Sequence, residues 1–156
     1  MKHKSTRKIL LVGSSGGHLA HLYMLKPIWE KDEHAWVSFN KEDTNNILDE
    51  EKIYYCYFPT NRNIKNLIKN SFLALKVLRK EKPNIIISSG AGVAIPFFWL
   101  GKLLRGTKNI YIEVYDRIDA PTVTGKICHP VSDLFIVQWE EMKKIYKKAI
   151  NLGSIF

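Results

Sequence analysis

The stretch that decides the fold is Lys8-Ile9-Leu10-Leu11-Val12-Gly13-Ser14-Ser15-Gly16-Gly17-His18, followed by the segment 19–26. Residues 8–12 are mostly apolar and predict a buried strand, whereas residues 19–26 carry apolar side chains at helical spacing. A glycine-rich turn between a strand and a helix gathers backbone N–H groups at the positive end of a helix dipole, which favours an anion. We therefore predict a phosphate-type site at Gly13, Ser14, Ser15, Gly16 and Gly17, with His18 as a titratable side chain beside it.

The same turn is compatible with a plain connection between a strand and a helix that binds nothing. Two well-known phosphate loops are excluded by the spacing. A P-loop would end in Gly-Lys-Ser/Thr, and a dinucleotide fingerprint would read Gly-x-Gly-x-x-Gly; the segment 13–18 matches neither pattern.

Composition narrows the class of protein and its partners. The 156 residues suit one domain with a proper hydrophobic core. The net charge of +9 is uneven, because residues 1–60 hold 8 Lys or Arg and 8 Asp or Glu, whereas residues 61–156 hold 16 and 7. This excess predicts an anionic partner: nucleic acid, an acidic membrane surface or a phosphorylated substrate. Cys56 and Cys128 lack CxxC spacing and indicate a reducing compartment.

Apolar runs and helical patterns alternate along the chain. We expect further strands at 35–39, 53–58, 84–88, 109–114 and 133–137, and further helices at 43–51, 63–80, 93–104 and 140–150. This alternation predicts an α/β fold with a Rossmann-like, mostly parallel sheet and helices on both faces. Ligands in such sheets bind beyond the carboxyl ends of the strands. Asp43 to Asn46 offer cap chemistry for the helix 43–51.

A second glycine-rich turn, Ser88-Ser89-Gly90-Ala91-Gly92, repeats the design of the first. Small residues again lie between an apolar strand and a helix, so the backbone can approach a ligand closely. Two such turns on one edge of the sheet predict a site for a diphosphate or a similar anion.

Two helices have features of a membrane surface, and each also has a plainer interpretation. In the helix 93–104, Phe97, Phe98 and Trp99 precede Lys102 and Arg105, which fits either a buried helix or an apolar patch edged by cations. The helix 63–80 has one stripe of lysines, which fits a solvated face or an anionic membrane. These lysines are Lys65, Lys69, Lys76 and Lys80.

Glu113 and Arg117 follow the expected strand 109–114. A carboxylate at the carboxyl end of a strand can act as a general base or orient a sugar hydroxyl, whereas an ion pair with Arg117 would only shape the loop. His18 similarly fits a base or a helix cap. The remaining histidines, His3, His21, His34 and His129, have no metal-ligand spacing.

Four stretches, in order, resemble the acceptor subunits of two-part UDP-sugar glycosyltransferases. They are Leu10 to Leu19, Ser88 to Gly92, Glu113 with Arg117, and Thr124-Gly125-Lys126 through Asp133 to Trp139. That family includes bacterial capsule and exopolysaccharide subunits and the membrane-anchoring subunit of the eukaryotic dolichol-pathway N-acetylglucosaminyltransferase. The likeness covers nearly the whole chain.

The resemblance implies the N-terminal half of a GT-B fold, similar to the N-terminal domain of the peptidoglycan lipid II N-acetylglucosaminyltransferase. It implies an inverting glycosyltransferase for surface polysaccharide, in which a separate donor-binding subunit mainly holds the UDP-sugar and this chain binds no cofactor tightly. An undecaprenyl-diphosphate sugar would place its phosphates at Gly13–Gly17 and Gly90–Gly92. His18 and Glu113 are then candidates for the base or for positioning the acceptor. No metal is needed, because protein dipoles can stabilise the leaving diphosphate.

The resemblance also bears on localisation and assembly. The N-terminal membrane helix of the eukaryotic subunit has no counterpart here, so we expect peripheral attachment at the cytoplasmic face of the cell membrane. Residues 1–156 are expected to form one acceptor domain, with 140–156 as a helix and an apolar tail, Ile155 and Phe156, for partner contact. The alternative is a non-catalytic subunit that recruits and enhances a partner with the whole active site. Nucleic acid is not expected as a partner, because the chain lacks a recognisable motif for it.

Overall fold

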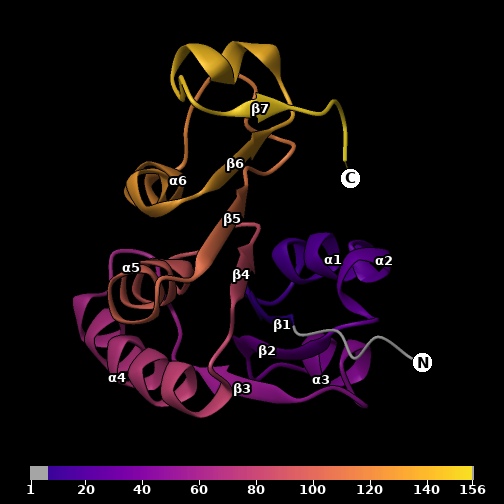
Figure 1. Cartoon of the computed structure of the whole chain (residues 1–156), viewed down its shortest axis with the longest axis vertical. Helices are drawn as coiled ribbons and strands as arrows, with labels where there is room; N and C mark the ends of the chain where they lie inside the picture. Colours follow the sequence, from indigo (N-terminus) through magenta and orange to yellow (C-terminus); the bar gives the residue numbers. More distant parts are fainter. Residues whose placement is uncertain (1–6, 156) are drawn as a thin grey trace.

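Residues 7–155, which the computed structural model describes, are built on a parallel sheet of seven strands in the order β3-β2-β1-β4-β5-β6-β7 (Figure 1). The chain builds outward from β1 to β3, crosses back to β4 beside β1, and then continues to the other edge. This reversal between β1 and β4 is the place where open α/β sheets bind their ligands. The strands are β1 (Lys8–Val12), β2 (Glu33–Phe39), β3 (Ile53–Cys56), β4 (Ile85–Ser88), β5 (Lys108–Ile112), β6 (Leu134–Val137) and β7 (Ile150–Asn151).

Helices cover both faces of the sheet (Figure 1). One layer contains α1 (Gly17–Met24), α2 (Lys26–Trp29) and α3 (Glu42–Ile47), and the other contains α4 (Ile64–Glu81), α5 (Ala94–Arg105) and α6 (Val123–Cys128). Two short 3-10 helices, η1 (His129–Val131) and η2 (Glu140–Lys144), flank β6. The expected Rossmann-like α/β architecture is confirmed. Within residues 7–155, no helix combines the length and the apolar character needed to cross a membrane.

Alternate residues of the strands feed two separate cores, as a sheet covered on both faces requires. Leu10 and Val12 of β1 pack with Phe97 and Phe98 of α5. Ile9 and Leu11, which point the other way, belong to a second core together with helices α1 and α2. The sheet is therefore buried on both sides, and only its edges and the ends of its strands can present a site.

The expectation of a helix at 140–150 is wrong. This segment forms the 3-10 helix η2, then a loop, and then the short edge strand β7, which pairs in parallel with β6. Met142, Tyr146 and Ala149 are all buried, so their helix-like spacing reflects packing onto the core and not a continuous helix. Ile155 of the expected partner-binding tail packs partly against the second core, and Phe156 lies outside the described residues, as does His3.

Smaller differences concern element ends and caps. The third strand ends at Cys56 and not at Phe58. Helix α3 begins at Glu42 and has no side-chain cap, so the expected cap role for Asp43 is wrong. Helix α6, for which no helix was expected, begins after Thr122, whose side chain accepts a hydrogen bond from the Gly125 N–H.

Candidate functional site

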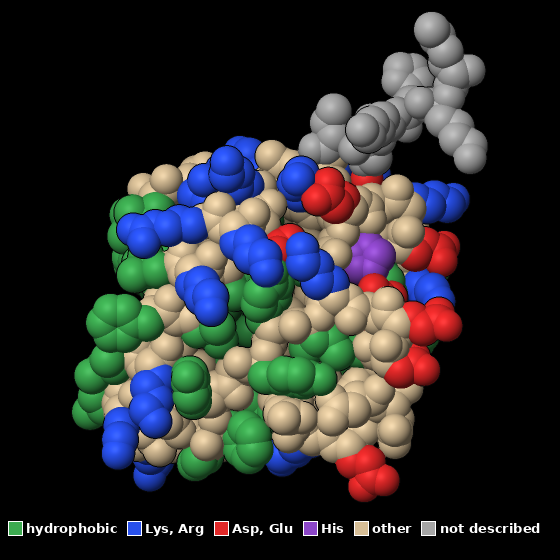
Figure 2. Space-filling view, turned by 90° about the horizontal axis from the view of Figure 1, so that it is seen from below, with side chains coloured by type: hydrophobic (Ala, Val, Ile, Leu, Met, Phe, Trp, Pro, Cys, Tyr) green, Lys and Arg blue, Asp and Glu red, His purple; other side chains and the backbone are tan. Residues whose placement is uncertain are grey.

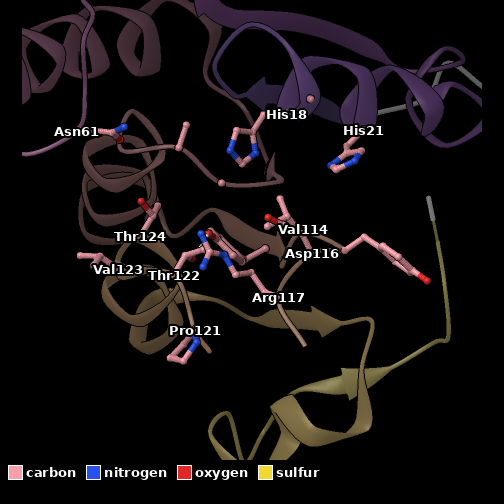
Figure 3. A pocket seen from close by; sticks show the side chains of 15 residues that line it. His18, His21, Asn61, Val114, Asp116, Arg117, Pro121, Thr122, Val123 and Thr124 are labelled. Carbon is pink, nitrogen blue, oxygen red and sulfur yellow. Dashed lines mark hydrogen bonds between the residues drawn. The ribbon is translucent and has the colours of Figure 1, made fainter. Parts of the chain in front are cut away.

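A cleft of about 780 Å³ lies where the chain leaves the carboxyl ends of β1, β4 and β5. A volume of this size is typical of a small-molecule site. His18 and His21 of α1 border one side, the second glycine-rich turn contributes Gly90 and Ala91, and the β5–α6 loop closes the other side (Figure 3). Residues that the sequence places far apart thus meet at the reversal point of the sheet.

His18 projects from the first turn of α1 into this cleft (Figure 3). Its Nδ1–H donates to the Ser89 carbonyl at 2.9 Å, and the Ser89 hydroxyl donates to the His18 carbonyl at 3.0 Å. Because a carbonyl can only accept, Nδ1 carries the proton and Nε2 of the neutral ring is an acceptor. The structure does not use His18 as the cap of α1, whose N-cap is Gly16.

Burial lowers the pKa of His18, and the nearby His21 lowers it further, while the hydrogen bond to Ser89 and the charge of Asp116 oppose the shift. The imidazole is therefore neutral at neutral pH. A neutral ring with an oriented Nε2 has the properties of a general base.

The second turn forms the wall against which the His18 ring rests. Gly90 has a φ of +122°, and a Cβ at this position would lie 2.8 Å from His18 Cε1 and 3.2 Å from the Tyr111 hydroxyl. Only glycine fits such a conformation and such a contact. A Cβ on Gly92 would lie 2.9 Å from the Thr60 carbonyl oxygen, so this glycine also permits a close contact. This turn sets the position of His18 in addition to lining the cleft.

The first turn is arranged differently from the prediction. Gly13, Ser14, Ser15 and Gly16 are not among the residues that line the cleft, which takes only Gly17 and His18 from this region. The Gly13 N–H donates to the Val37 carbonyl at 3.0 Å, and the Gly16 N–H donates to the Asp43 carboxylate at 2.7 Å. Of the five residues of the predicted anion site, only Gly17 lines the cleft, together with the adjacent His18.

Glu113 lies beneath the cleft and not in it. Its side chain is only 1% exposed, and both carboxylate oxygens accept a hydrogen bond from the Thr122 hydroxyl at 3.1 Å. The Tyr146 hydroxyl donates to it at 3.3 Å, and burial raises the pKa of Glu113. Among the described residues it forms no ion pair with Arg117. The geometry favours a positioning residue that holds Thr122, and thus the start of α6, beside the cleft.

The β5–α6 loop supplies the charged groups of the cleft. Asp116 and Arg117 face His18 and His21 across it (Figure 3). Burial lowers the pKa of His21, against the opposing charge of Asp116. An anion in this cleft would meet Arg117 and the start of α1, while Asp116 would repel it.

Sequence reasoning missed several residues that line the cleft. His21 lies three residues after His18, a spacing that places both on one face of α1, so this signal was available. The Pro121-Thr122 pair before α6 was also readable as a helix start. Asn61 and Tyr111 carry no local signal, because only the folded chain brings them to the cleft.

The predicted membrane-surface residues separate into two groups. Phe97 and Phe98 are fully buried, so their assignment to an exposed patch is wrong, because this side of α5 packs onto the sheet, where the Phe98 ring lies edge-on to Tyr111 of β5. Trp99 is partly exposed, Lys102 pairs with Asp133 at 2.6 Å, and Arg105 is exposed. The four predicted lysines of α4 are all exposed.

Helix α4 is more apolar on its outer side than the stripe of lysines suggested. Its buried residues are Asn70, Ala74, Val77 and Leu78. Four large apolar side chains of the same helix are exposed beside the lysines: Ile64, Leu67, Ile68 and Phe72. Figure 2 shows green and blue side chains intermingled on the side of the molecule that carries α4, while red side chains gather on the opposite side.

Residues that could hold a metal ion are not gathered here. Within residues 7–155, no three His, Cys, Asp or Glu side chains are grouped so as to share one ion.

The fold and the cleft define the class of protein: a Rossmann-like domain of the kind found in GT-B glycosyltransferases and related epimerases. MurG from Acinetobacter baumannii superposes with a TM-score of 0.72 at 15% identity, covering 86% of this chain and 42% of that chain. UDP-N-acetylglucosamine 2-epimerase from Rickettsia bellii gives 0.73 at 16% identity, covering 95% and 45%. The chain spans less than half the length of these two proteins.

The family is more specific than this class. The family described as "Oligosaccharide biosynthesis protein Alg14 like" matches residues 9–155, and the chain belongs to it. The mouse UDP-N-acetylglucosamine transferase subunit ALG14 is 25% identical over 97% of this chain and 84% of its own length. The subunit of the same name from Candida albicans is 38% identical over 54% of this chain and 40% of its own length. The expected relationship to subunits of UDP-sugar glycosyltransferases is thereby confirmed.

Proposed function

We propose that this chain is the acceptor-binding subunit of a two-component, inverting glycosyltransferase. A partner subunit supplies the UDP-sugar, and this chain presents a sugar linked to a lipid diphosphate. The observation that carries the proposal is the His18–Ser89 pair in the cleft, which keeps a neutral imidazole with Nε2 available as an acceptor. The names of the relatives favour UDP-N-acetylglucosamine as the donor.

The geometry supports a simple division of labour. The acceptor diphosphate lies at the start of α1 and beside Ala91, with Arg117 as its cation. Nε2 of His18 takes the proton of the attacking hydroxyl as its oxygen forms the new bond to the anomeric carbon of the donor. The bond from that carbon to the diphosphate of UDP breaks, and UDP leaves with the electron pair. Glu113 keeps Thr122 and α6 in place during this step.

The test uses the chain co-purified with its donor subunit, with UDP-N-acetylglucosamine and farnesyl-diphosphate-linked N-acetylglucosamine as substrates. His18→Asn retains an N–H that can donate to the Ser89 carbonyl but has no group equivalent to Nε2. We expect kcat to fall by about 10²- to 10⁴-fold with the complex intact. We also expect the isolated chain to have no turnover.

Unchanged kcat in the His18→Asn complex would overturn the assignment of the base to this chain. It would support the alternative of a non-catalytic subunit that recruits and enhances its partner. Turnover by the isolated chain would contradict the two-component proposal itself.

We further propose that the exposed apolar and basic face of α4 contacts an anionic membrane at the cytoplasmic side, where the acceptor lipid resides. The lysines attract anionic headgroups, and the apolar side chains beside them can enter the interface. We also propose that the transferase acts in the biosynthesis of a surface polysaccharide.

Vesicles test this face directly. Lys65→Glu/Lys69→Glu should lower binding to phosphatidylserine-containing vesicles, because each cation near such a surface contributes about 1 kcal/mol. The matched control is Lys26→Glu/Lys31→Glu, two exposed lysines outside α4. Equal losses in both variants, or equal binding to neutral vesicles, would show that the α4 lysines are only a solvated face.

A further inference from the structure

An apolar groove of about 590 Å³ lies next to the cleft, between the start of α4, the start of α5 and α6. We propose that it binds the first isoprene units of a prenyl diphosphate whose phosphates occupy the cleft. This inference rests on the proposed function and extends it from the phosphate end of the acceptor to its lipid chain. The groove is lined mainly by apolar side chains, among them Ile64, Leu67, Ile95, Val123 and Ile127.

The groove and the cleft are continuous. Asn61, Val123 and Thr124 line both, so a single ligand can pass from one to the other without leaving the protein surface. The cleft contributes histidines and Arg117, whereas the groove contributes aliphatic side chains from three helices. A ligand that fits both must be anionic at one end and apolar at the other.

The walls of the groove are fixed by close packing. The Thr60 carbonyl oxygen lies 2.9 Å from the position of a Cβ on Gly92, so the segment before α4 rests directly on the second glycine-rich turn. Asn63 caps α4 by accepting from the Asn66 N–H at 2.9 Å, and Asn66 donates to the Pro59 carbonyl at 2.9 Å. These contacts anchor the segment 59–66, which forms one wall of the groove.

The outer end of the groove merges with the face that we assign to the membrane. Ile64 and Val123 line the groove and are 75% and 73% exposed, and Lys65 follows Ile64 on the same helix. A lipid chain leaving the groove therefore reaches an apolar surface bordered by cations. This continuity favours a prenyl chain over a peptide, which would have to place polar backbone groups along aliphatic walls.

The test compares farnesyl diphosphate with inorganic diphosphate, each titrated into the ¹⁵N-labelled full chain below the critical micelle concentration. We expect inorganic diphosphate to shift the amide signals of Gly17, His18 and Gly90 only. Farnesyl diphosphate should shift these and also Leu67, Ile95 and Ile127, and it should bind at least tenfold more tightly.

Paired variants separate the groove from the general apolar surface. Ile64→Asn/Ile127→Asn changes two exposed groove residues that do not line the cleft, and Leu103→Asn/Leu104→Asn changes two α5 residues that are 70% and 59% exposed and lie outside the groove. We expect the first pair of substitutions to lower the affinity for farnesyl diphosphate at least tenfold and to leave the affinity for inorganic diphosphate unchanged. The second pair should change neither affinity.

Three outcomes are decisive. If both pairs of substitutions lowered the affinity for farnesyl diphosphate equally, the groove would not be the binding site of the prenyl chain, because that chain would then lie on the apolar surface in general. Inorganic diphosphate could bind in the cleft while farnesyl diphosphate shifts no amide signal of the groove. This result would contradict the proposal for the groove but not the proposed function. Farnesol could shift the amide signals of the groove while inorganic diphosphate does not bind. This result would support binding of the prenyl chain in the groove and contradict the placement of the phosphates in the cleft.

Discussion

Gly16 and Gly17 of the first glycine-rich turn face open space, whereas Gly90 and Gly92 of the second turn are packed tightly against their neighbours. A Cβ added at Gly16 or Gly17 would have no atom within 4 Å, but one added at Gly90 would lie 2.8 Å from His18. The two turns have similar sequences and occupy equivalent places after β1 and β4. Their glycines nevertheless serve different purposes, access at Gly17 and close packing at Gly90.

The difference shows how the cleft is organised. In the second turn, the Ser89 carbonyl and the Gly90 backbone contact the His18 ring and orient it. The first turn is secured from the other side by Asp43, which accepts from the Gly16 N–H. A carboxylate at that position disfavours a phosphate there, so the proposed function places the anion at Gly17 and His18.

The largest expected effect is on stability at the packed turn. Gly90→Ala introduces a Cβ at a positive φ and into contact with the His18 ring, so we expect a loss of about 1–3 kcal/mol in the free energy of unfolding. Gly17→Ala meets no neighbouring atom and should change stability by less than about 0.5 kcal/mol. Urea unfolding of both variants checks the contrast, and equal losses would contradict it.

A pH titration of stability tests how the packing of His18 against the second turn contributes to folding. The pKa of His18 is lowered mainly by burial, so its neutral form stabilises the fold at pH above the unfolded value of 6.5, and this contribution is lost as the pH falls through the lowered pKa. His18→Asn should therefore lose less stability than the wild type between pH 7 and pH 5. Each unit of pKa shift corresponds to about 1.4 kcal/mol.

His21 and His129 also have lowered pKa values, but they are present in both proteins, so the difference between the two titrations reports on His18. Parallel curves for wild type and variant would show that the His18 ring does not couple to folding.

The smallest expected effect concerns the anchor of the first turn. Asp43→Asn keeps an oxygen that can accept from Gly16 but removes the charge, and we expect a loss of at most about 1 kcal/mol. The variant should also bind inorganic phosphate more tightly, because the negative charge beside α1 is gone. Glu42→Gln removes a charge from the neighbouring exposed residue and serves as the control. Equal phosphate affinities for the two variants would refute a specific effect of Asp43.

Local patterns were sufficient for most of the sheet and its helices. The apolar run of β1 and the glycine-rich turn predicted the first strand, turn and helix, and Asn63 correctly marked the start of α4. These features can be predicted locally, because the sequence signals for a buried strand, an amphipathic helix and a helix cap each span only a few consecutive residues. Gly90 and His18 were also recognisable as candidates, since glycine-rich turns after parallel strands meet at one edge.

Contacts between distant segments decided the rest. Residues 140–150 have a helix-like apolar pattern. In the fold, however, Ile150 and Asn151 pair with the edge of β6 as strand β7, and the 3-10 helix η2 packs onto the core. Similarly, the sequence allows Phe97 and Phe98 to form a surface patch, but the fold buries both in the core, where Phe98 lies against Tyr111 of β5.

The sequence by itself determined that this protein is a parallel α/β fold with two glycine-rich turns at one edge, because the alternation of strands and helices leaves little other choice. Only the tertiary structure decided that Glu113 is buried under Thr122, that Asp43 occupies the Gly16 N–H, and that Asn61 and Val123 join the cleft to the apolar groove. Burial and hydrogen bonding of a side chain depend on what the fold packs against it. No spacing along the chain encodes that neighbour.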